Sequence, residues 1–224
     1  MSRQGKGILI TGSSGFIGSN LVSMANSLNL DITTLDSVGK PDIKCDITDA
    51  DWEKIGLSNF KTVIHLAAKT SVSESLENPN NFLDVNSKAT RKLFSACVEQ
   101  NVERVIFASS AAVYGSSEEE TKKIGEEGKP ASPYAETKLH GEEIARKLSS
   151  DNTTFLCLRF FNVYGPSQKI DGEYSAVIPA FIQSAISGQD IEIHGDGGQT
   201  RDFIHVSDVC SAIISSLSTP LSSF

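Results

Sequence analysis

Short apolar runs alternate along this chain with longer segments in which apolar residues recur every third or fourth position. The first pattern is typical of strands buried in a sheet, and the second of helices that cover one. We expect strands at residues 8–11, 31–36, 42–45, 61–68, 102–108, 154–161 and 191–193, and helices at residues 16–28, 80–100, 133–148 and 177–187. This alternation predicts an α/β fold with a doubly wound parallel sheet.

A glycine-rich loop follows the first expected strand and leads directly into the first helix. Gly12 can adopt the positive φ of a tight turn, Gly15 has no Cβ to keep an anion from the backbone, and Gly18 lets the helix approach the strand. The start of the helix offers unpaired N–H groups and a partial positive charge to a phosphate. This spacing is not the more familiar G-x-G-x-x-G, and a purely structural turn is the alternative.

Carboxylates end the next two expected strands. Asp36 closes the second strand, where an acidic residue can bind the adenosine ribose hydroxyls of a dinucleotide and repel a 2′-phosphate. Asp46 follows the third strand, where it can reach an adenine amino group; alternatively, Asp46 or Thr48 caps a helix. The loop and Asp36 together predict a Rossmann domain that binds NAD.

The helix expected at residues 133–148 has Ser132 as its cap and Pro133 at its first position. Tyr134 and Lys138 then lie one turn apart on one face. A phenol has a reference pKa of about 10, and a neighbouring ammonium with an oxidised nicotinamide would lower that pKa toward neutral pH. The pair is therefore a candidate general base with its activating group, and an exposed i,i+4 pair is the alternative.

Two other polar features lie in or after expected strands. Ser109 and Ser110 leave the end of the strand at residues 102–108, where a hydroxyl can hydrogen-bond a reacting group or cap a turn. His65 lies within an apolar strand, a position typical of a packed, hydrogen-bonded histidine rather than a catalytic one.

The composition changes beyond Pro166, where Gly, Pro, Ser and Gln become frequent and the alternation of strand and helix loosens. We expect an NAD-binding domain over residues 1–165 and a small, partial substrate lobe over residues 166–224, with a segment that packs back on the first domain. Within this lobe Arg201 can clamp a phosphate, or pair with Asp196 or Asp202.

Charge and cysteine usage narrow the classes of function. The formal net charge is −8 without a basic cluster, which disfavours binding to nucleic acid or an anionic membrane. The four cysteines are far apart and form no C-x-x-C, as expected for reduced thiols of a cytoplasmic protein. No apolar run is long enough to span a bilayer, and His194 and His205 lack the spacing of metal ligands, so we expect neither a membrane span nor a metal site.

Six motifs resemble, in this order, those of the extended short-chain dehydrogenase/reductases that act on nucleotide sugars, and above all the UDP-glucose 4-epimerases. They are Thr11–Gly18, His65–Ala68, Ser109–Gly115, Tyr134-x-x-x-Lys138, Arg159–Asn162 and Gly195–Asp208. The resemblance extends from about residue 6 to residue 217. Relatives continue for on the order of a hundred further residues, as the family leads us to expect, so the C-terminal lobe is expected to be short.

The resemblance implies NAD-dependent epimerisation at C4 of a UDP-sugar through a transient 4-keto intermediate. Tyr134 would take the 4-hydroxyl proton, Ser110 would share that hydrogen bond, and Lys138 would hold the nicotinamide ribose and lower the pKa of Tyr134. Related dehydratases carry an acidic pair where this chain has Ala111 and Ala112, which favours an epimerase. The alternatives are another nucleotide-sugar enzyme, such as a dehydratase or dehydrogenase, and an NAD-binding module without turnover.

The resemblance also implies sets of contacts and an assembly. The expected cofactor contacts are Gly12, Gly15, Phe16, Ile17, Gly18, Asp36, Asp46, Ile47, Leu66, Ala67, Ala68, Asn86, Tyr134, Lys138 and Phe161. The expected nucleotide-sugar contacts are Ser110, Tyr134, Asn162, Val177, Glu192, His194 and Arg201. A homodimer through helices 80–100 and 134–149 is expected as well.

Overall fold

Six parallel strands form the central sheet of the computed structural model, which describes residues 7–117, 121–168, 176–193 and 195–220. The strands are β1 (Gly7–Thr11), β2 (Ile32–Asp36), β3 (Ile43–Lys44), β4 (Phe60–His65), β5 (Arg104–Ser110) and β6 (Thr154–Phe160). Their order across the sheet is β3-β2-β1-β4-β5-β6, and every neighbouring pair is parallel. The predicted doubly wound Rossmann architecture is confirmed.

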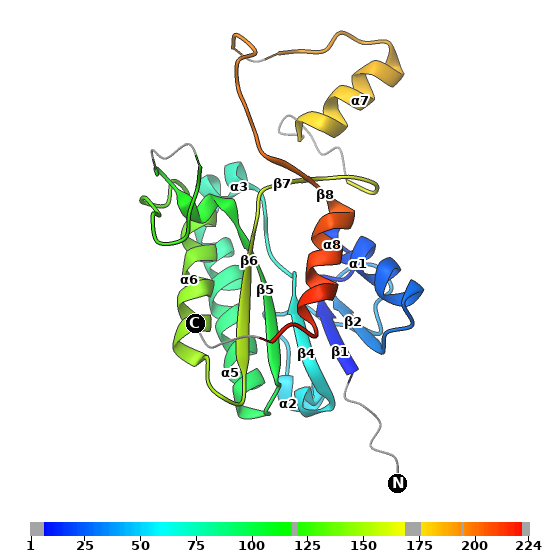
Figure 1. Cartoon of the computed structure of the whole chain (residues 1–224), viewed down its shortest axis with the longest axis vertical. Helices are drawn as coiled ribbons and strands as arrows, with labels where there is room; N and C mark the ends of the chain where they lie inside the picture. Colours follow the sequence, from blue (N-terminus) through cyan, green and yellow to red (C-terminus); the bar gives the residue numbers. More distant parts are fainter. Residues whose placement is uncertain (1–6, 118–120, 169–175, 194, 221–224) are drawn as a thin grey trace.

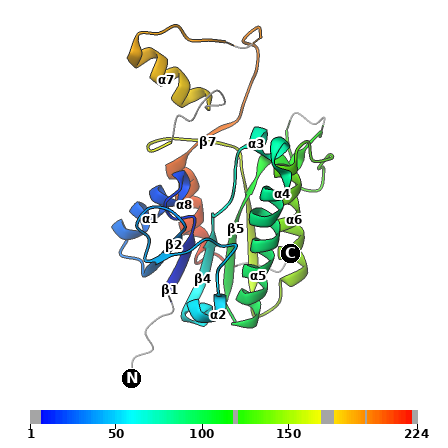
Figure 2. The same ribbon diagram turned by 180° about the vertical axis from the view of Figure 1, so that it is seen from behind.

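Helices cover both faces of this sheet (Figures 1 and 2). They are α1 (Phe16–Ser27), α2 (Trp52–Ile55), α3 (Val72–Glu77), α4 (Pro79–Phe82), α5 (Thr90–Glu99), α6 (Pro133–Leu148), α7 (Val177–Ser187) and α8 (Val206–Ser216). Short 3-10 turns occur at Leu57–Asn59 and Ala111–Tyr114, and a π-helical segment, Leu83–Ala89, joins α4 to α5. The single helix expected at residues 80–100 is therefore a composite of α4, the π segment and α5.

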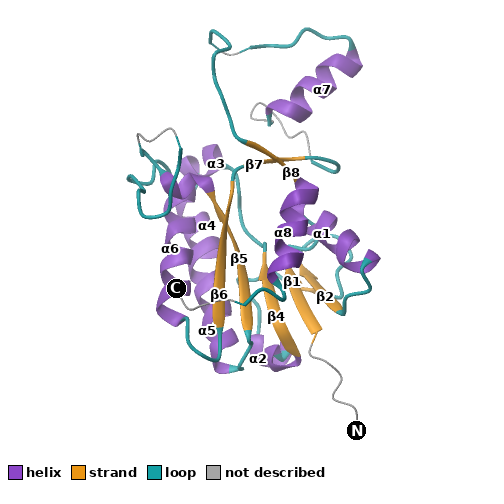
Figure 3. Cartoon of the chain, viewed as in Figure 1, coloured by secondary structure: helices purple, strands orange, loops and turns teal. Residues whose placement is uncertain are grey.

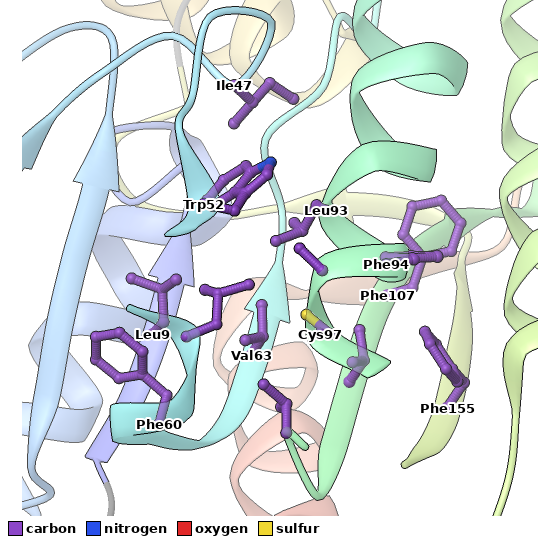
Figure 4. Packing of buried hydrophobic residues seen from close by; sticks show 14 of the residues in the cluster. Leu9, Ile47, Trp52, Phe60, Val63, Leu93, Phe94, Cys97, Phe107 and Phe155 are labelled. Atoms are coloured by element: carbon purple, nitrogen blue, oxygen red, sulfur yellow. The ribbon is translucent and has the colours of Figure 1, made fainter. Parts of the chain in front are cut away.

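The core on the α5 and α6 side is rich in aromatic rings (Figure 4). Phe94 of α5 lies between Phe107 of β5 and Phe155 of β6, with ring centroids 5.5 and 5.1 Å away. A Cβ on Gly141 would lie only 2.6 Å from ring carbons of Phe107, so glycine lets α6 approach β5 closely. This close approach brings the inner face of α6 against β5.

The core on the opposite face is closed by α8, which comes from the C-terminal part of the chain. Val206, Val209, Cys210 and Ile213 of α8 are buried in one cluster with Leu21 of α1 and with strand residues Ile10, Ile64 and Ile106. The α8 helix packs beside α1 (Figure 1). The last helix described in the chain is thus part of the core of the main sheet.

A small second sheet lies beyond the carboxyl ends of the main strands (Figure 3). It pairs β7 (Asn162–Tyr164) with β8 (Phe203–His205) in parallel. The α7 helix lies apart from the main sheet, as Figure 1 shows. The strand expected at residues 191–193 is wrong: this stretch has no regular structure, and Ile191 and Ile193 are 44% and 61% exposed because no strand lies beside them to pair with.

Within the part of the chain that the structure describes, no helix is both long and apolar enough to cross a membrane.

Candidate active site

A cleft of about 630 Å³ opens at the carboxyl ends of the main strands, where ligands of such sheets bind. Every residue predicted to contact the cofactor lines this cleft except Asn86. Ser109 and Ser110, which the sequence also singled out, line the cleft; sequence reasoning missed the remaining lining residues, which are Leu35, Ser37, Val38, Cys45, Lys69, Thr70, Val85, Ala108, Phe160 and Val163. Most of them directly precede or follow a predicted residue at a strand end, and this adjacency was the signal that could have found them.

The glycine loop has no room for larger residues at two of its positions. Gly12 has φ of 71°, and a Cβ there would lie 2.5 Å from Ala67 N. A Cβ on Gly18 would lie 2.0 Å from Gly12 O, so only glycine lets α1 start this close to β1. Gly15 precedes α1 without a side-chain cap, and its own Cβ would meet only Gly12 O, at 3.3 Å. The first N–H groups of α1 therefore border the cleft without a side-chain cap, an arrangement that favours an anion.

The two carboxylates expected at the cleft are held in place by backbone N–H groups. Asp36 accepts hydrogen bonds from Ser14 N (2.8 Å) and Val38 N (3.1 Å). Asp46 accepts hydrogen bonds from the backbone and the hydroxyl of Thr48 (2.9 and 2.8 Å). The alternative in which Asp46 or Thr48 caps a helix is wrong, because Asp51 caps α2 by accepting from Lys54 N. Both aspartates line the cleft with fixed orientations.

Asn86 lies in the π segment and supports the cleft from behind. Its Oδ1 accepts from Lys69 N (2.8 Å), and its Nδ2 donates to Lys69 O (2.9 Å) and Thr137 Oγ1 (3.2 Å). The side chain is buried and thus clamps the segment after β4 to α6. Because these bonds occupy the amide, its direct contact with a cofactor is not seen in the geometry and stays a prediction.

Tyr134 and Lys138 lie on the buried face of α6 and border the cleft. Ser132 caps this helix by accepting from Ala135 N (3.2 Å), and Pro133 is at its start, as predicted. Lys138 Nζ donates to Ala108 O (2.8 Å) and lies 5.9 Å from the ring centroid of Tyr134. The alternative of an exposed i,i+4 pair is therefore wrong.

Burial dominates the protonation of this pair. It lowers the pKa of Lys138 to about 8. Burial raises the pKa of Tyr134 above its ordinary value, and hydrogen bonding to Ser110 acts in the opposite direction. The expected lowering of the Tyr134 pKa by Lys138 is thus not found in the protein alone, because removal of the phenol from water outweighs it. A further positive charge beside the ring is needed to favour phenolate.

Ser110 and its neighbour Ser109 have different surroundings. Ser110 Oγ accepts from Ala112 N (3.1 Å) and so caps the 3-10 turn Ala111–Tyr114, while the residue also lines the cleft. Ser109 is buried, and its hydroxyl donates to Glu142. Both roles considered for the serine pair are therefore compatible with the position of Ser110.

His65 is a packed, neutral histidine, as predicted. Its two ring nitrogens are hydrogen-bonded to Thr11 Oγ1 (2.8 Å) and Thr90 Oγ1 (3.0 Å). Burial, aided by the charge of Lys138, lowers its pKa to about 3. Its hydrogen bonds join β1, β4 and α5 beneath the cleft.

The residues expected to contact the nucleotide sugar do not converge. Asn162, Val177, Glu192 and Arg201 are exposed in the C-terminal part and do not line the cleft, whereas Ser110 and Tyr134 do. Arg201 donates to the carbonyl of its neighbour Thr200 (2.7 Å), and no ion pair joins it to Asp196 or Asp202. His194 lies outside the described residues. Among the described residues, no three His, Cys, Asp or Glu side chains are grouped to hold a metal ion.

Comparison with known proteins identifies a family that the chain resembles over most of its length. A model of the NAD dependent epimerase/dehydratase family matches residues 8–223. A putative UDP-glucose 4-epimerase of Methanocaldococcus jannaschii is 35% identical over 223 residues, which cover 94% of this chain and 73% of that protein. A UDP-N-acetyl-alpha-D-glucosaminuronate decarboxylase of Bacillus cytotoxicus is 33% identical over 230 residues, which cover 95% of this chain and 71% of that protein.

A solved structure shares the fold over nearly the whole chain. MoeE5 in complex with UDP-glucuronic acid and NAD superposes with a TM-score of 0.88 at 36% identity, over 97% of this chain and 74% of that one.

Proposed function

The chain belongs to the NAD-dependent epimerase/dehydratase family, and from this membership we propose that it interconverts the C4 epimers of a UDP-sugar. Family membership by itself indicates an NAD-dependent enzyme that modifies nucleotide sugars. Epimerases and a decarboxylase both occur among the relatives, so the finer proposal depends on the residues around Tyr134.

The residues of the cleft fit NAD. The uncapped start of α1 suits the diphosphate, because Gly15 places no Cβ between the loop backbone and a ligand. Asp36 suits the adenosine ribose, since a carboxylate accepts hydrogen bonds from two hydroxyls and repels a 2′-phosphate. Bound there, NAD supplies the redox chemistry at C4 of the sugar.

The role of Tyr134 is to accept and return the proton of the sugar 4-hydroxyl. Ser110 stabilises the phenolate by hydrogen bonding, and the oxidised nicotinamide of bound NAD would add, beside Lys138, the further positive charge that ionisation of the buried ring needs. Oxidation at C4 flattens that carbon, and reduction from the other side inverts it. The protein must therefore accept the sugar ring with either face toward the nicotinamide.

The epimerase proposal depends on two alanine side chains beside Ser110. Ala111 and Ala112 directly follow Ser110, which lines the cleft, and begin the 3-10 turn Ala111–Tyr114. Elimination of water needs one group to protonate the leaving hydroxyl and another to remove a ring proton, and alanine can do neither. The pair leaves Tyr134 as the proton-transfer group beside the sugar.

Incubation with UDP-glucose or UDP-N-acetylglucosamine tests the proposal. The purified protein loaded with NAD should form the C4 epimer, detected by proton NMR, and Tyr134→Phe should abolish it. Tyr164→Phe is the matched control, because Tyr164 packs against Phe203 and His205 of the small sheet instead of lining the cleft. Equal turnover by Tyr134→Phe, a stable keto-deoxy product or stoichiometric NADH would refute the proposal.

An NAD-binding module without turnover is the second candidate. It is favoured by the exposure and separation of Asn162, Val177, Glu192 and Arg201. Calorimetry separates the two candidates: the module binds NAD but gives no heat with a UDP-sugar, whereas the epimerase binds both. The proposal also includes a homodimer paired through the helical stretches at residues 80–100 and 134–149, which sedimentation equilibrium tests.

A further inference from the structure

A buried ion pair lies below the cleft, between β6 and α6. Arg159 Nε donates to Glu142 Oε1 (2.9 Å), and Arg159 Nη2 donates to Glu142 Oε2 (2.7 Å). The two side chains are only 11% and 7% exposed. A bidentate pair of this kind has a fixed geometry, because two parallel hydrogen bonds leave neither group free to rotate.

The same carboxylate also holds β5. Ser109 Oγ donates to Glu142 Oε1 (2.5 Å), and Ser109 is the register partner of Arg159 in the β5–β6 ladder. Glu142 lies one turn beyond Lys138 and two turns beyond Tyr134 on the buried face of α6. Lys138 makes the adjacent link from α6 to β5, through Ala108 O. Glu142 therefore lies on the helix that carries Tyr134 and joins β5, β6 and α6, with its link to β5 made through Ser109, the residue directly before Ser110.

Arg159 also fixes the chain that follows Ser110. Its guanidinium carbon lies 4.7 Å from the ring centroid of Tyr114, which ends the 3-10 turn, and its Nη1 pairs with Glu127. Gly128 N donates to Tyr114 O (3.0 Å), which closes the loop between these two contacts. The segment that begins at Ser110 is thus held before it by Ser109 and after it by Tyr114.

We propose that Glu142 and Arg159 are positioning residues that keep the Ser110 hydroxyl within hydrogen-bonding reach of the Tyr134 phenol. The inference rests on the proposed role of Tyr134 as the proton-transfer group. Neither Glu142 nor Arg159 lines the cleft, so they act through Ser109, Tyr114 and α6. Loss of this support should weaken the chemical step and leave ligand contacts in place.

Ser109→Ala is the sharpest variant, because it removes the bond between Glu142 and β5 and leaves the buried ion pair intact. Ser216→Ala is its matched control: Ser216 is 8% exposed, its hydroxyl donates to Ile213 O (2.6 Å), and it lies at the end of α8, outside the cleft. Glu142→Gln, compared with exposed Glu143→Gln on the same helix, tests the ion pair itself.

We expect Ser109→Ala to lower kcat for the UDP-sugar about tenfold while KM and NAD content stay within about twofold. The Tyr134 pKa should rise in the NAD-loaded variant, measured in stopped-flow pH jumps as the tyrosinate absorbance that Tyr134→Phe lacks. Ser216→Ala should change neither quantity. A melting temperature lowered in Ser109→Ala, with kcat and the tyrosinate titration equal to those of Ser216→Ala, would overturn the inference.

The titration needs no substrate, so the inference and the proposed function fail separately. A wild-type protein without turnover, whose tyrosinate titration nevertheless moves in Ser109→Ala, refutes the epimerase and supports the positioning role. Turnover by the wild type with an unmoved titration in Ser109→Ala refutes the positioning role and supports the epimerase.

Discussion

Lys138 Nζ donates a hydrogen bond to Ala108 O at 2.8 Å, which ties the buried ammonium to the end of β5. Burial lowers the Lys138 pKa from 10.5 to about 8, so the folded protein retains a costly buried charge at neutral pH. Between these two values the unfolded chain binds more protons than the folded one. The free energy of unfolding gains from this residue as pH rises through that window.

Lys138→Met should therefore be more stable than the wild type at pH 7, by roughly 3 kcal/mol less the value of the lost hydrogen bond. The advantage should shrink as the pH rises from about 8 to 10.5, because the folded wild-type lysine is then neutral while the unfolded one is still mostly protonated. Urea unfolding at a series of pH values measures it, with exposed Lys147→Met as the control. A stability difference that stays constant with pH would contradict the prediction.

His65 should make the fold sensitive to mild acid. Burial lowers its pKa from 6.5 to about 3. The unfolded chain therefore binds a proton near pH 6.5, whereas His65 of the folded protein stays neutral. The contribution of His65 to the free energy of unfolding is fully present above pH 6.5. It decreases as the pH falls, by roughly 2 kcal/mol at pH 5. His65→Gln should remove this slope, and the control variant is His140→Gln, at a half-buried histidine whose ring lies 3.0 Å from Arg91 Nη2. Parallel pH dependence of the wild type and His65→Gln would count against the assignment.

Gly15 and Gly18 should separate ligand binding from folding. In Gly15→Ala the added Cβ meets only Gly12 O, at 3.3 Å, so the fold should persist, while NAD affinity should fall about tenfold or more because the methyl enters the phosphate position. In Gly18→Ala the contact of 2.0 Å with Gly12 O should lower the melting temperature as well. Calorimetric titration with NAD and thermal unfolding test both expectations, which fail if Gly15→Ala binds NAD normally.

Asp36→Asn should reduce the preference for NAD over NADP. The carboxylate is held by Ser14 N and Val38 N, and its charge should account for about tenfold of the discrimination against a 2′-phosphate. Asp49→Asn removes an exposed charge outside the cleft and is the control. The test is the ratio of the dissociation constants for NADP and NAD, measured for each protein. An unchanged ratio in Asp36→Asn would show that the adenosine ribose does not bind at Asp36.

Asn86→Ala should loosen the segment after β4. It leaves Lys69 N and Lys69 O without their partner, at a cost of about 2 kcal/mol. Hydrogen exchange should accelerate at residues 66–70 and remain unchanged in β6. Asn20→Ala, which also removes an amide that donates to two carbonyls, serves as the comparison. Equal protection of residues 66–70 in Asn86→Ala and wild type would exclude the clamp.

The sheet and most of the cleft follow from local sequence patterns. The apolar run before Gly12 predicts a buried strand, and Ser132 with Pro133 predicts the start of α6, because capping and periodicity are decided by near neighbours. Asp36 is found by the same reasoning, since the end of a strand identifies the edge of the sheet where a ligand binds.

Features that depend on distant partners were missed. Nothing local distinguishes Ile191 and Ile193 from a strand, and the absence of a pairing partner is a tertiary fact. β7 and β8 are three residues each and exist because they pair across a long separation in sequence. Glu142 and Arg159 look like ordinary surface charges until the fold brings them together.

The π segment Leu83–Ala89 determines which side chains of the long helical stretch face the neighbouring elements. A wider turn holds about one residue more than an α-turn, which shifts the phase of everything after it by about 100°. Asn86 can therefore point toward α6 while Leu93, Phe94 and Cys97 remain in the interior. Deletion of one residue from this segment would restore a regular α-helix. The helix could then keep either the Asn86 hydrogen bonds or the burial of Leu93, Phe94 and Cys97, but not both. The number of residues in the segment is therefore constrained more tightly than their identity.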